Sequence, residues 1–482
     1  MTHIAPLLHI LGRFLVALAA VMGIPLGYAL AIGDPPLPFA GAVAATAGAG
    51  LVLVFSTRRP RGDLTQREAL LLVGMVWVAT GLLGSLPFYL SPHFPSFTDA
   101  FFESTSGFTT TGATVLADVE VLSHSLQFWR CFSHWLGGMG IVVLGIAVLP
   151  LVGIGGMPLY RAEFSGAKSE KIRPRIRETA LALWKIYFGL TAALYLALRW
   201  AGMDPFEALC HAFSTLGTGG FSTRTASIAA FGSPRIEGIL ILFMLLAAVN
   251  FTLHYRLWVE RRVRGFLSDI ELRFFLGVVA LATAAILVAL LPGGGLTPSE
   301  ALRRSLFQVT SIITTTGFVT ADFEAWHPFP QQVLLLLMFI GGSTGSTAGG
   351  LKASRVLLLL KVIGREFKRL VERRGVFAVR LGSAAYPENA IQGLLNLVYL
   401  TFLVYFTGCL LLTAAGVDLL TAVSAVPASM FNIGPGLGAV GPADHYGHLP
   451  ALAKWVLGLC MIAGRLEFYT VLVLFTPAFW RR

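Results

Sequence analysis

The sequence carries little charge. Of its 482 residues only 13% are charged, whereas 55% are hydrophobic and the mean hydropathy is +0.74. A soluble globular domain carries about a quarter charged residues, so this composition excludes an ordinary soluble protein. Cysteine is also scarce, and the four cysteines lie in apolar segments without the spacing of a disulfide framework or metal site. We expect small buried side chains at Cys131, Cys210, Cys409 and Cys460.

Long apolar runs are abundant. Ten of them come near the roughly 20 residues that a helix needs to cross a bilayer. They lie at about 8–32, 38–56, 69–90, 127–152, 180–201, 236–258, 271–292, 331–360, 392–415 and 450–476. The first run is longer than the apolar region of a signal peptide and is expected to be a spanning helix. The sequence therefore predicts an all-α polytopic membrane protein.

Acidic residues are fewer than basic ones, 25 against 36, and the basic residues gather in alternate loops. Because lysine and arginine concentrate in cytoplasmic loops, the clusters predict that both termini are cytoplasmic. This topology accounts for the positive charge without nucleic acid. The clusters are Arg58, Arg59, Arg61 and Arg67; Arg161, Lys168, Lys171, Arg173, Arg175 and Arg177; Arg256, Arg261, Arg262 and Arg264; Lys361, Arg365, Lys368, Arg369, Arg373, Arg374 and Arg380; and Arg481 with Arg482.

A strip rich in threonine and glycine recurs four times. The strips are SGFTTTGATV from residue 106, STLGTGGFST from 214, TSIITTTGFVTADF from 310 and FNIGPGLGAV from 431. With Gly112, Gly219, Gly317 and Gly434 taken as equivalent points, the interval is roughly a hundred residues, which indicates an internal repeat.

Each strip follows an apolar segment of half the spanning length. These half-length helices are expected at about 97–107, 204–214, 298–310 and 419–430. Each opens with residues typical of a helix N-cap and first turn, namely Thr98-Asp99, Asp204-Pro205, Thr297-Pro298 and Asp418. Such helices reach only about half-way through a bilayer. Each must therefore dip into the membrane and return.

Returning backbone at mid-membrane depth persists only where protein buries it or where it meets water and ions. Glycine lets consecutive carbonyls turn toward one axis, and carbonyl and hydroxyl oxygens replace the hydration shell of a monovalent cation. Packing by small residues explains one strip considered alone but not four in register. The candidate ion ligands are Thr110, Thr111, Gly112, Thr218, Gly219, Thr315, Thr316, Gly317, Asn432, Ile433 and Gly434.

The eighth run is interrupted by GGSTGSTAGG at residues 341–350. Ten residues without a bulky side chain do not form a stable isolated helix, because each glycine costs about 1 kcal/mol relative to alanine. The break is expected to line a cavity, with a packing role as the alternative. The candidate residues in it are Gly341, Gly342, Ser343, Thr344, Gly345, Ser346, Thr347, Gly349 and Gly350.

Arg465 lies within the last apolar run, where a cation is costly, so its side chain must face the protein interior. It is either an electrostatic barrier to cations or a structural residue paired with Glu467 or with backbone carbonyls. Six carboxylates are expected near the outer mouth, where they concentrate cations or cap helices. They are Asp99, Glu103, Glu207, Glu300, Asp322 and Glu324.

Together with Tyr160-Arg161-Ala162-Glu163 and Pro174-Arg175-Ile176, the four strips resemble those of TrkH subunits in the Trk/Ktr/HKT superfamily of potassium transporters. The resemblance covers the chain from about residue 60. It implies an N-terminal two-helix hairpin followed by four M1–P–M2 repeats (helix, half-helix re-entrant loop, helix) around a central ion pathway. The implied boundaries are 1–60 for the hairpin and 61–160, 161–265, 266–380 and 381–482 for the repeats, the third with a broken second helix.

The resemblance also implies a function, which is potassium uptake across the bacterial inner membrane and not enzymatic catalysis. The four strips would form the selectivity filter of a channel-like pore, and residues 341–350 with Arg465 would form its gate. A Na⁺- or H⁺-coupled symporter is the alternative. The implied cargo is K⁺, with no cofactor bound by this chain itself. The implied partners are a second copy in a homodimer, a cytosolic TrkA-type nucleotide-binding regulatory subunit and membrane lipid, but no nucleic acid.

Overall fold

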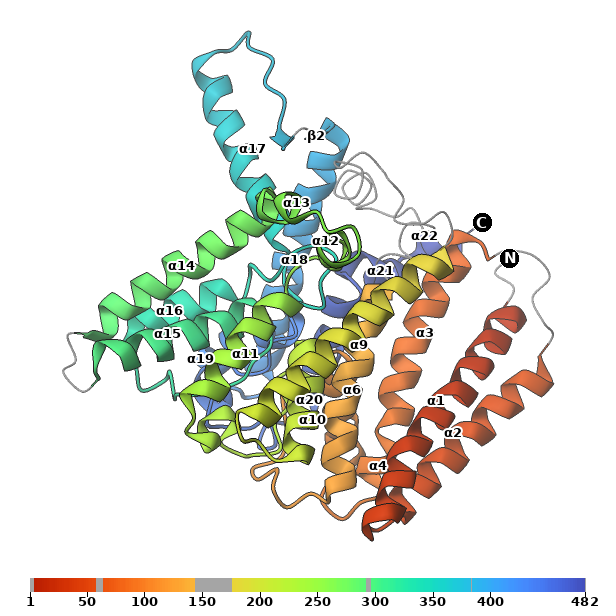
Figure 1. The fold of residues 1–482 in the computed structure, drawn as a ribbon. Coiled ribbons are helices and arrows are strands. Elements are labelled where there is room, and N and C mark those ends of the chain that lie inside the picture. The colour runs from red at the N-terminus through yellow and green to blue at the C-terminus, as the bar shows by residue number, and fades with distance from the viewer. Residues whose placement is uncertain (1–3, 58–63, 144–175, 292–295, 383, 482) are drawn as a thin grey trace.

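The computed structural model describes residues 4–57, 64–143, 176–291, 296–382 and 384–481. The regular secondary structure of its described residues is almost entirely helical (Figure 1). The one ladder among them is a two-residue antiparallel pairing of β1 (Arg380–Leu381) with β2 (Ala384–Ala385). The expected all-α architecture is confirmed.

The first two helices form the expected hairpin. α1 (Ile4–Ile32) and α2 (Leu37–Ser56) approach closely at two glycines, since a Cβ added at Gly12 would lie 2.7 Å from the carbonyl oxygen of Gly50. Figure 1 shows this hairpin at one flank of the molecule. It packs on α3 and α6 of the first repeat.

Four repeats follow, each with a half-length helix after its first long helix. The first has α3 (Gln66–Gly84), α4 (Leu86–Tyr89), α5 (Phe97–Phe108) and α6 (His124–Val143), and the second has α9 (Ile176–Trp200), α10 (Pro205–Gly217), α11 (Pro234–Ala247) and α12 (Phe251–Trp258). After α13 (Val263–Leu267), the third has α14 (Ile270–Leu290), α15 (Pro298–Ile313), α16 (Pro328–Leu337) and α17 (Ala353–Val371). The fourth has α18 (Glu388–Ala414), α19 (Leu419–Met430), α20 (Ala451–Arg465), α21 (Phe468–Leu472) and α22 (Pro477–Trp480), and short 3-10 helices cover Ser227–Phe231, Gly438–Val440 and Val473–Phe475.

The half-length helices α5, α10, α15 and α19 lie where the sequence predicts them. Side chains cap three of them as expected: Asp204, Thr297 and Asp418 each accept a backbone N–H of the first turn. The cap of α5 is Ser96, which accepts the N–H of Asp99, and not the predicted Thr98. Capping residues and proline at the first positions thus fix where the chain turns back into the bundle.

Not every predicted span is one straight helix. In the described residues six helices are long and apolar enough to cross a membrane, or up to eight if each of two bent pairs is counted as one span. The expected break in the eighth run is present between α16 and α17. The sixth and tenth runs were expected to be continuous, but α11 and α12 meet at 100° and α20 and the segment after it at 115°. Within the described residues, which end at Val143 in the first repeat, the second helices of three repeats are therefore broken, whereas only one break was expected.

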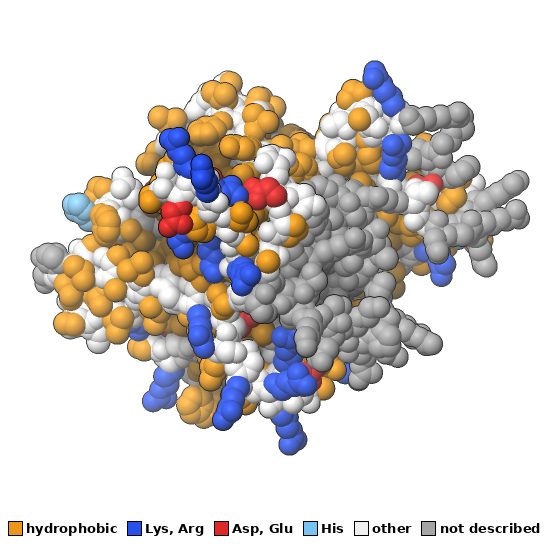
Figure 2. Space-filling view, turned by 90° about the horizontal axis from the view of Figure 1, so that it is seen from above, with side chains coloured by type: hydrophobic (Ala, Val, Ile, Leu, Met, Phe, Trp, Pro, Cys, Tyr) orange, Lys and Arg blue, Asp and Glu red, His pale blue; other side chains and the backbone are white. Residues whose placement is uncertain are grey.

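The beginning of α1, the beginning of α3 and the end of the described chain lie at the same end of the molecule (Figure 1). The guanidinium of Arg67 on α3 donates to the carbonyl of Arg481 over 2.8 Å, which agrees with that placement. α17 and the segment that leads from it to β1 project beyond this end (Figure 1). Figure 2, which views that end, shows many lysine and arginine side chains and few carboxylates. The predicted basic positions 58, 59, 61, 161–175 and 482, and the motif residues 160–163 and 174–175, lie outside the described residues.

Candidate ion pathway

The four half-length helices end in the same turn. The residue after each last turn, Thr110, Thr218, Thr315 or Asn432, has a left-handed φ between 54° and 58°. The next backbone N–H returns to the carbonyl five residues earlier, over 2.8 to 2.9 Å in all four repeats. Asparagine tolerates this conformation, but for a β-branched threonine it is uncommon. Three strained threonines at equivalent points indicate a functional constraint.

Beyond these turns the strips meet in a closed ring. Two residues after each left-handed residue stands a glycine with φ between 80° and 102°. A Cβ added at any of these glycines would collide with a carbonyl oxygen of the next strip, and the last strip closes on the first. The four close pairs are Gly112 with Gly219 O (1.9 Å), Gly220 with Thr316 O (2.0 Å), Gly317 with Ile433 O (1.9 Å) and Gly434 with Thr111 O (2.7 Å).

The ring corrects one equivalence drawn from the sequence. Gly219 was taken as the counterpart of Gly112, but the glycine with the matching φ and the matching collision is Gly220. Gly219 instead corresponds to Thr111, Thr316 and Ile433, whose carbonyls complete the ring. The sequence alone does not decide between the two glycines of TGGF, because Gly219 and Gly220 both lie at the repeat interval from the glycines of the other strips. All eleven predicted strip residues nevertheless lie in or beside the ring.

A cavity of about 90 Å³ opens on one side of the ring. All four ring glycines, Gly112, Gly220, Gly317 and Gly434, contribute to its lining. Charged groups at its wall include Arg130, Arg224 and Asp444. Near this wall, burial raises the pKa of Glu324 above its ordinary value, and the carboxylates of Asp444 and Asp322 add to that shift.

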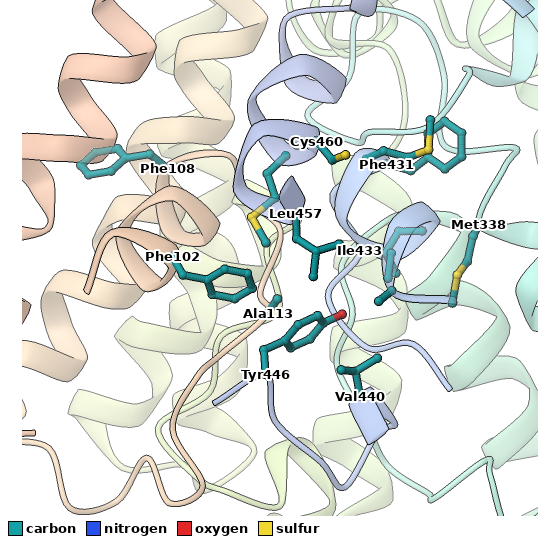
Figure 3. Close-up of a cluster of buried hydrophobic side chains, with 14 of the residues drawn as sticks. Phe102, Phe108, Ala113, Met338, Phe431, Ile433, Val440, Tyr446, Leu457 and Cys460 are labelled. Atoms are coloured by element: carbon teal, nitrogen blue, oxygen red, sulfur yellow. The ribbon is translucent and has the colours of Figure 1, made fainter. Parts of the chain in front are cut away.

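Apolar side chains hold the strips from behind. Figure 3 shows Phe102, Ala113, Ile433, Tyr446 and Leu457 clustered around the first and fourth strips. The Tyr446 hydroxyl donates to the carbonyl of Gly434 over 2.6 Å, and the Tyr446 N–H donates to the carbonyl of Thr114 over 2.7 Å. Tyr446 therefore ties two strips together. Sequence reasoning missed it, because it lies in a loop after the repeat pattern ends.

Residues 341–350 lie against the opposite side of the ring. The hydroxyl of Thr218 donates to the carbonyl of Thr347 over 3.0 Å, and the N–H of Gly349 donates to the hydroxyl of Thr315 over 2.7 Å. A Cβ at Gly349 would lie 2.1 Å from the carbonyl oxygen of Phe431. We call residues 341–350 the intramembrane loop. The intramembrane loop contacts the left-handed residues Thr218 and Thr315, whereas the cavity is lined by the glycines that follow the left-handed residues. The loop and the cavity therefore lie on opposite sides of the ring.

Both edges of the intramembrane loop are fastened to other elements. A carboxylate oxygen of Glu271, at the start of α14, accepts the N–H of Thr344 over 2.7 Å and that of Ser354 over 3.1 Å. The N–H of Ser343 donates to the carbonyl of Ala248, at the break between α11 and α12. The loop thus links the third repeat to the break in the second.

Arg465 reaches the intramembrane loop from the end of α20. Its side chain is 3% exposed, and its guanidinium donates to the carbonyl of Thr347 over 2.9 Å and to that of Gly137 over 3.4 Å. The expected inward orientation and carbonyl contacts are present. Glu467, the other expected partner, instead pairs with Arg355 over 2.8 Å.

The predicted outer-mouth carboxylates are mostly engaged in ion pairs. Glu103 is fully buried and pairs over 2.7 Å with Arg130, a residue of the cavity wall, so it lies beside the cavity in a structural ion pair. Asp99 pairs with Lys454 and Glu207 with Arg224, while Glu300 completes the cap of α15. Arg130 and Lys454 were missed, although a cation inside an expected span is itself the signal of a buried partner.

In each repeat a half-length helix is followed by a strip, and the four strips surround one axis. This arrangement defines the chain as a polytopic membrane protein built from helix, re-entrant half-helix, helix units. Comparison with known proteins then places the chain more closely. Residues 39–482 match the TrkH family of cation transport proteins, and the chain belongs to this family.

Individual relatives resemble the chain over nearly its whole length. It is 45% identical over 439 residues to the Trk system potassium uptake protein TrkH of Salmonella typhimurium, covering 90% of each chain. It is 43% identical over 479 residues to the protein of that name from Halomonas elongata, covering 99% of each. A crystal structure of the potassium transporter TrkH from Vibrio parahaemolyticus superposes with a TM-score of 0.92 at 40% identity, covering 99% of this chain and 100% of that one.

Proposed function

We propose that the chain carries K⁺ into the cell through a channel-like pore in the bacterial inner membrane, with the ring of four strips as its selectivity filter. The observation that carries the proposal is the closed ring of Gly112, Gly220, Gly317 and Gly434 against the carbonyls of the neighbouring strips. Carbonyls packed this closely around one axis substitute for the hydration shell of a monovalent cation. The relatives named above as potassium uptake proteins support the choice of ion.

The proposed ion ligands are the residues of the ring and its turns. The carbonyls of Thr111, Gly219, Thr316 and Ile433 form one layer, and the left-handed residues Thr110, Thr218, Thr315 and Asn432 form the layer nearer the intramembrane loop. The half-length helices support this assignment, because their carbonyl ends carry the negative end of the helix dipole. A cation is stabilised there and an anion is not.

The proposed gate is the intramembrane loop together with Arg465. The loop lies directly beneath the ring, and the guanidinium adds positive charge beside Thr347. A cation leaving the ring meets both. Opening therefore requires the loop to leave Thr218, Thr315 and Arg465, and its glycines, among them Gly341, Gly345 and Gly350 with φ between 74° and 79°, permit alternative backbone conformations.

The proposal extends to topology and partners. The basic end that bears α17 is the cytoplasmic one by the distribution of lysine and arginine, so both termini are cytoplasmic. The boundaries 1–60, 61–160, 161–265, 266–380 and 381–482 divide the hairpin from the repeats. The assembly comprises two copies of the chain and a cytosolic TrkA-type nucleotide-binding subunit, with lipid around the helices.

Tracer uptake tests the proposal. Purified chain in proteoliposomes takes up ⁸⁶Rb⁺, with K⁺, Na⁺ and Li⁺ as separate competitors, and Gly317→Ser is compared with the wild type. A side chain at Gly317 meets the carbonyl of Ile433 in a left-handed conformation, so we expect K⁺ to compete better than Na⁺ in the wild type and this preference to be lost in the variant. Uptake that requires an imposed Na⁺ or H⁺ gradient would favour the coupled symporter. An unchanged preference for K⁺ in Gly317→Ser would show that the ring is not the selectivity filter.

A further inference from the structure

The second strip lacks a side chain that the other three possess. The residues whose carbonyls complete the ring are Thr111, Thr316, Ile433 and, in the second strip, Gly219. Thr111 bonds through its hydroxyl to Thr109 over 2.8 Å, and Thr316 bonds to Thr314 over the same distance. Ile433 is fully buried in the apolar core. Only Gly219 has no side chain with which to anchor its carbonyl.

A histidine from the neighbouring repeat occupies the missing volume. The three atoms nearest to a Cβ added at Gly219 all belong to the His134 ring: Nδ1 at 2.2 Å, Cγ at 2.3 Å and Cε1 at 2.6 Å. His134 is on α6 of the first repeat and is fully buried. The φ of Gly219 is not in the left-handed region, so its backbone accepts a side chain, and the imidazole is the nearest obstacle.

The same imidazole holds the second strip on both sides of the ring carbonyl. Its Nδ1 lies 3.3 Å from the hydroxyl of Ser214, and the carbonyl of Ser214 accepts the N–H of Gly219 over 2.8 Å. Nδ1 also accepts the N–H of Phe221 over 3.5 Å, and the two rings stack with centroids 4.2 Å apart. Phe221 in turn lies under the guanidinium of Arg130, 4.0 Å from the ring centroid.

We propose that His134 is a positioning residue for ion selectivity, supplying from the first repeat the side chain that the second strip lacks. It sets the position of the Gly219 carbonyl and so the size of the ring on that side. Groups that hold a site's ligands must restrict them to about 0.5 Å, and a void behind Gly219 releases this restraint. The inference rests on the proposed filter function.

Complementary substitutions test it. His134→Ala empties the space behind Gly219, and Gly219→Thr overfills it; each single variant loses selectivity. The double variant His134→Ala/Gly219→Thr gives the second strip the side chain that the first and third strips have. In ⁸⁶Rb⁺ uptake we expect the ratio of Na⁺ to K⁺ concentrations at half inhibition to fall about tenfold in His134→Ala, within the range for loss of an outer-shell partner, and to recover in the double variant.

Two controls separate the possible outcomes. His254→Ala removes another fully buried histidine, whose Nε2 contacts the carbonyl of Leu246 and not the ring; it should keep the wild-type ratio. Gly220→Ser tests the ring itself. If Gly220→Ser loses selectivity while His134→Ala keeps it, only the role of His134 is overturned. If Gly220→Ser also keeps it, the filter proposal fails. If His134→Ala lowers the ratio and the double variant stays as low, His134 acts on packing in general and the inference is overturned.

Discussion

At the scale of residues, the least expected feature is a buried ion pair behind the first strip. Glu103 and Arg130 are 0% and 1% exposed, and the carboxylate also accepts the N–H of Val115 over 3.0 Å. Arg130 reaches the second strip as well, donating to the carbonyl of Ser222 over 3.3 Å. Through these contacts the ion pair links the first strip to the second.

Removing one member of this pair should be costly. Glu103→Gln leaves the Arg130 charge buried without its counter-ion, which in comparable sites costs about 3–5 kcal/mol. We expect a clearly lowered midpoint of thermal unfolding in detergent. The double variant Glu103→Leu/Arg130→Met leaves no unpaired charge and should lose less.

The exposed pair of Arg369 with Glu366 provides the control. Arg369→Gln should leave the unfolding midpoint unchanged, because exposed ion pairs contribute little and Glu366 keeps its pair with Arg365. A Glu103→Gln protein as stable as the wild type, or a Glu103→Leu/Arg130→Met protein less stable than Glu103→Gln, would refute this view of the pair.

The sequence could predict a residue's role only where the local sequence pattern carries the signal. The threonines and glycines of the strips were identifiable, because composition changes abruptly there between apolar runs. The left-handed conformation of Thr110, Thr218 and Thr315 was not, since threonine disfavours it and only the closed ring explains it. Likewise, neither Gly220 nor His134 could be assigned before the neighbouring strip and helix were in place.

At the scale of elements, the intramembrane loop is held to the ring by a few hydrogen bonds. Thr315→Val removes the acceptor of the Gly349 N–H, and Arg465→Gln removes the positive charge at Thr347. Because one hydrogen bond contributes about 0.5–1.5 kcal/mol, we expect Thr315→Val to raise basal ⁸⁶Rb⁺ uptake roughly two- to tenfold. Arg465→Gln should raise it further, since it also removes a barrier to cations.

The two changes should not be additive, because both release the same loop. Thr413→Val on α18 is the matched control: that hydroxyl bonds to its own helix, at the carbonyl of Cys409, and not to the loop. Uptake in this control should equal that of the wild type. Basal uptake that stays at or below the wild-type rate in both Thr315→Val and Arg465→Gln would exclude the loop as the closing element.

Elements were predicted well where the signal is local. The half-length helices were found because their caps and prolines are sequence features. The bend after α11 was missed, because Ala247, Ala248 and Val249 are as apolar as any spanning helix. The structure shows Asn250 capping α12 by accepting the N–H of Thr252 over 2.8 Å, and the carbonyl of Ala248, freed by the break, receives the N–H of Ser343. Such a break depends on a partner loop nearly a hundred residues away.

At the scale of the whole molecule, topology is directly testable. All four native cysteines are buried, so single cysteines introduced at exposed sites report without background. Val376→Cys, after α17 and 99% exposed, should react with a membrane-impermeant maleimide only in inside-out vesicles. Val121→Cys, before α6 and 53% exposed, should react only in right-side-out vesicles. The opposite pattern would show that the orientation in the membrane is the reverse of the proposed one. Reaction of both cysteines from the same side of the membrane would rule out the four-repeat topology.

The fold as a whole was predictable because four copies of one pattern constrain it more than any single copy does. Helix α6 packs on α10, α11 on α15 and α20 on α5, so each of these half-length helices rests on the second helix of the preceding repeat. This cyclic contact brings the strips to one axis. The order of the repeats follows from the sequence. The contact of α20 with α5 joins the fourth repeat to the first, and it forms only when the chain folds.

The ring as an ion-binding site is tested most directly by locating the ion. Crystals of the chain grown with Tl⁺ or Rb⁺ in place of K⁺ would give anomalous density at the heavy cation. We predict a peak on the axis of the ring, between the carbonyls of Thr111, Gly219, Thr316 and Ile433, that weakens when excess K⁺ is added and much less when Na⁺ is added. An empty ring with the cation bound elsewhere, or a peak that Na⁺ displaces as readily as K⁺, would contradict a potassium filter at this position.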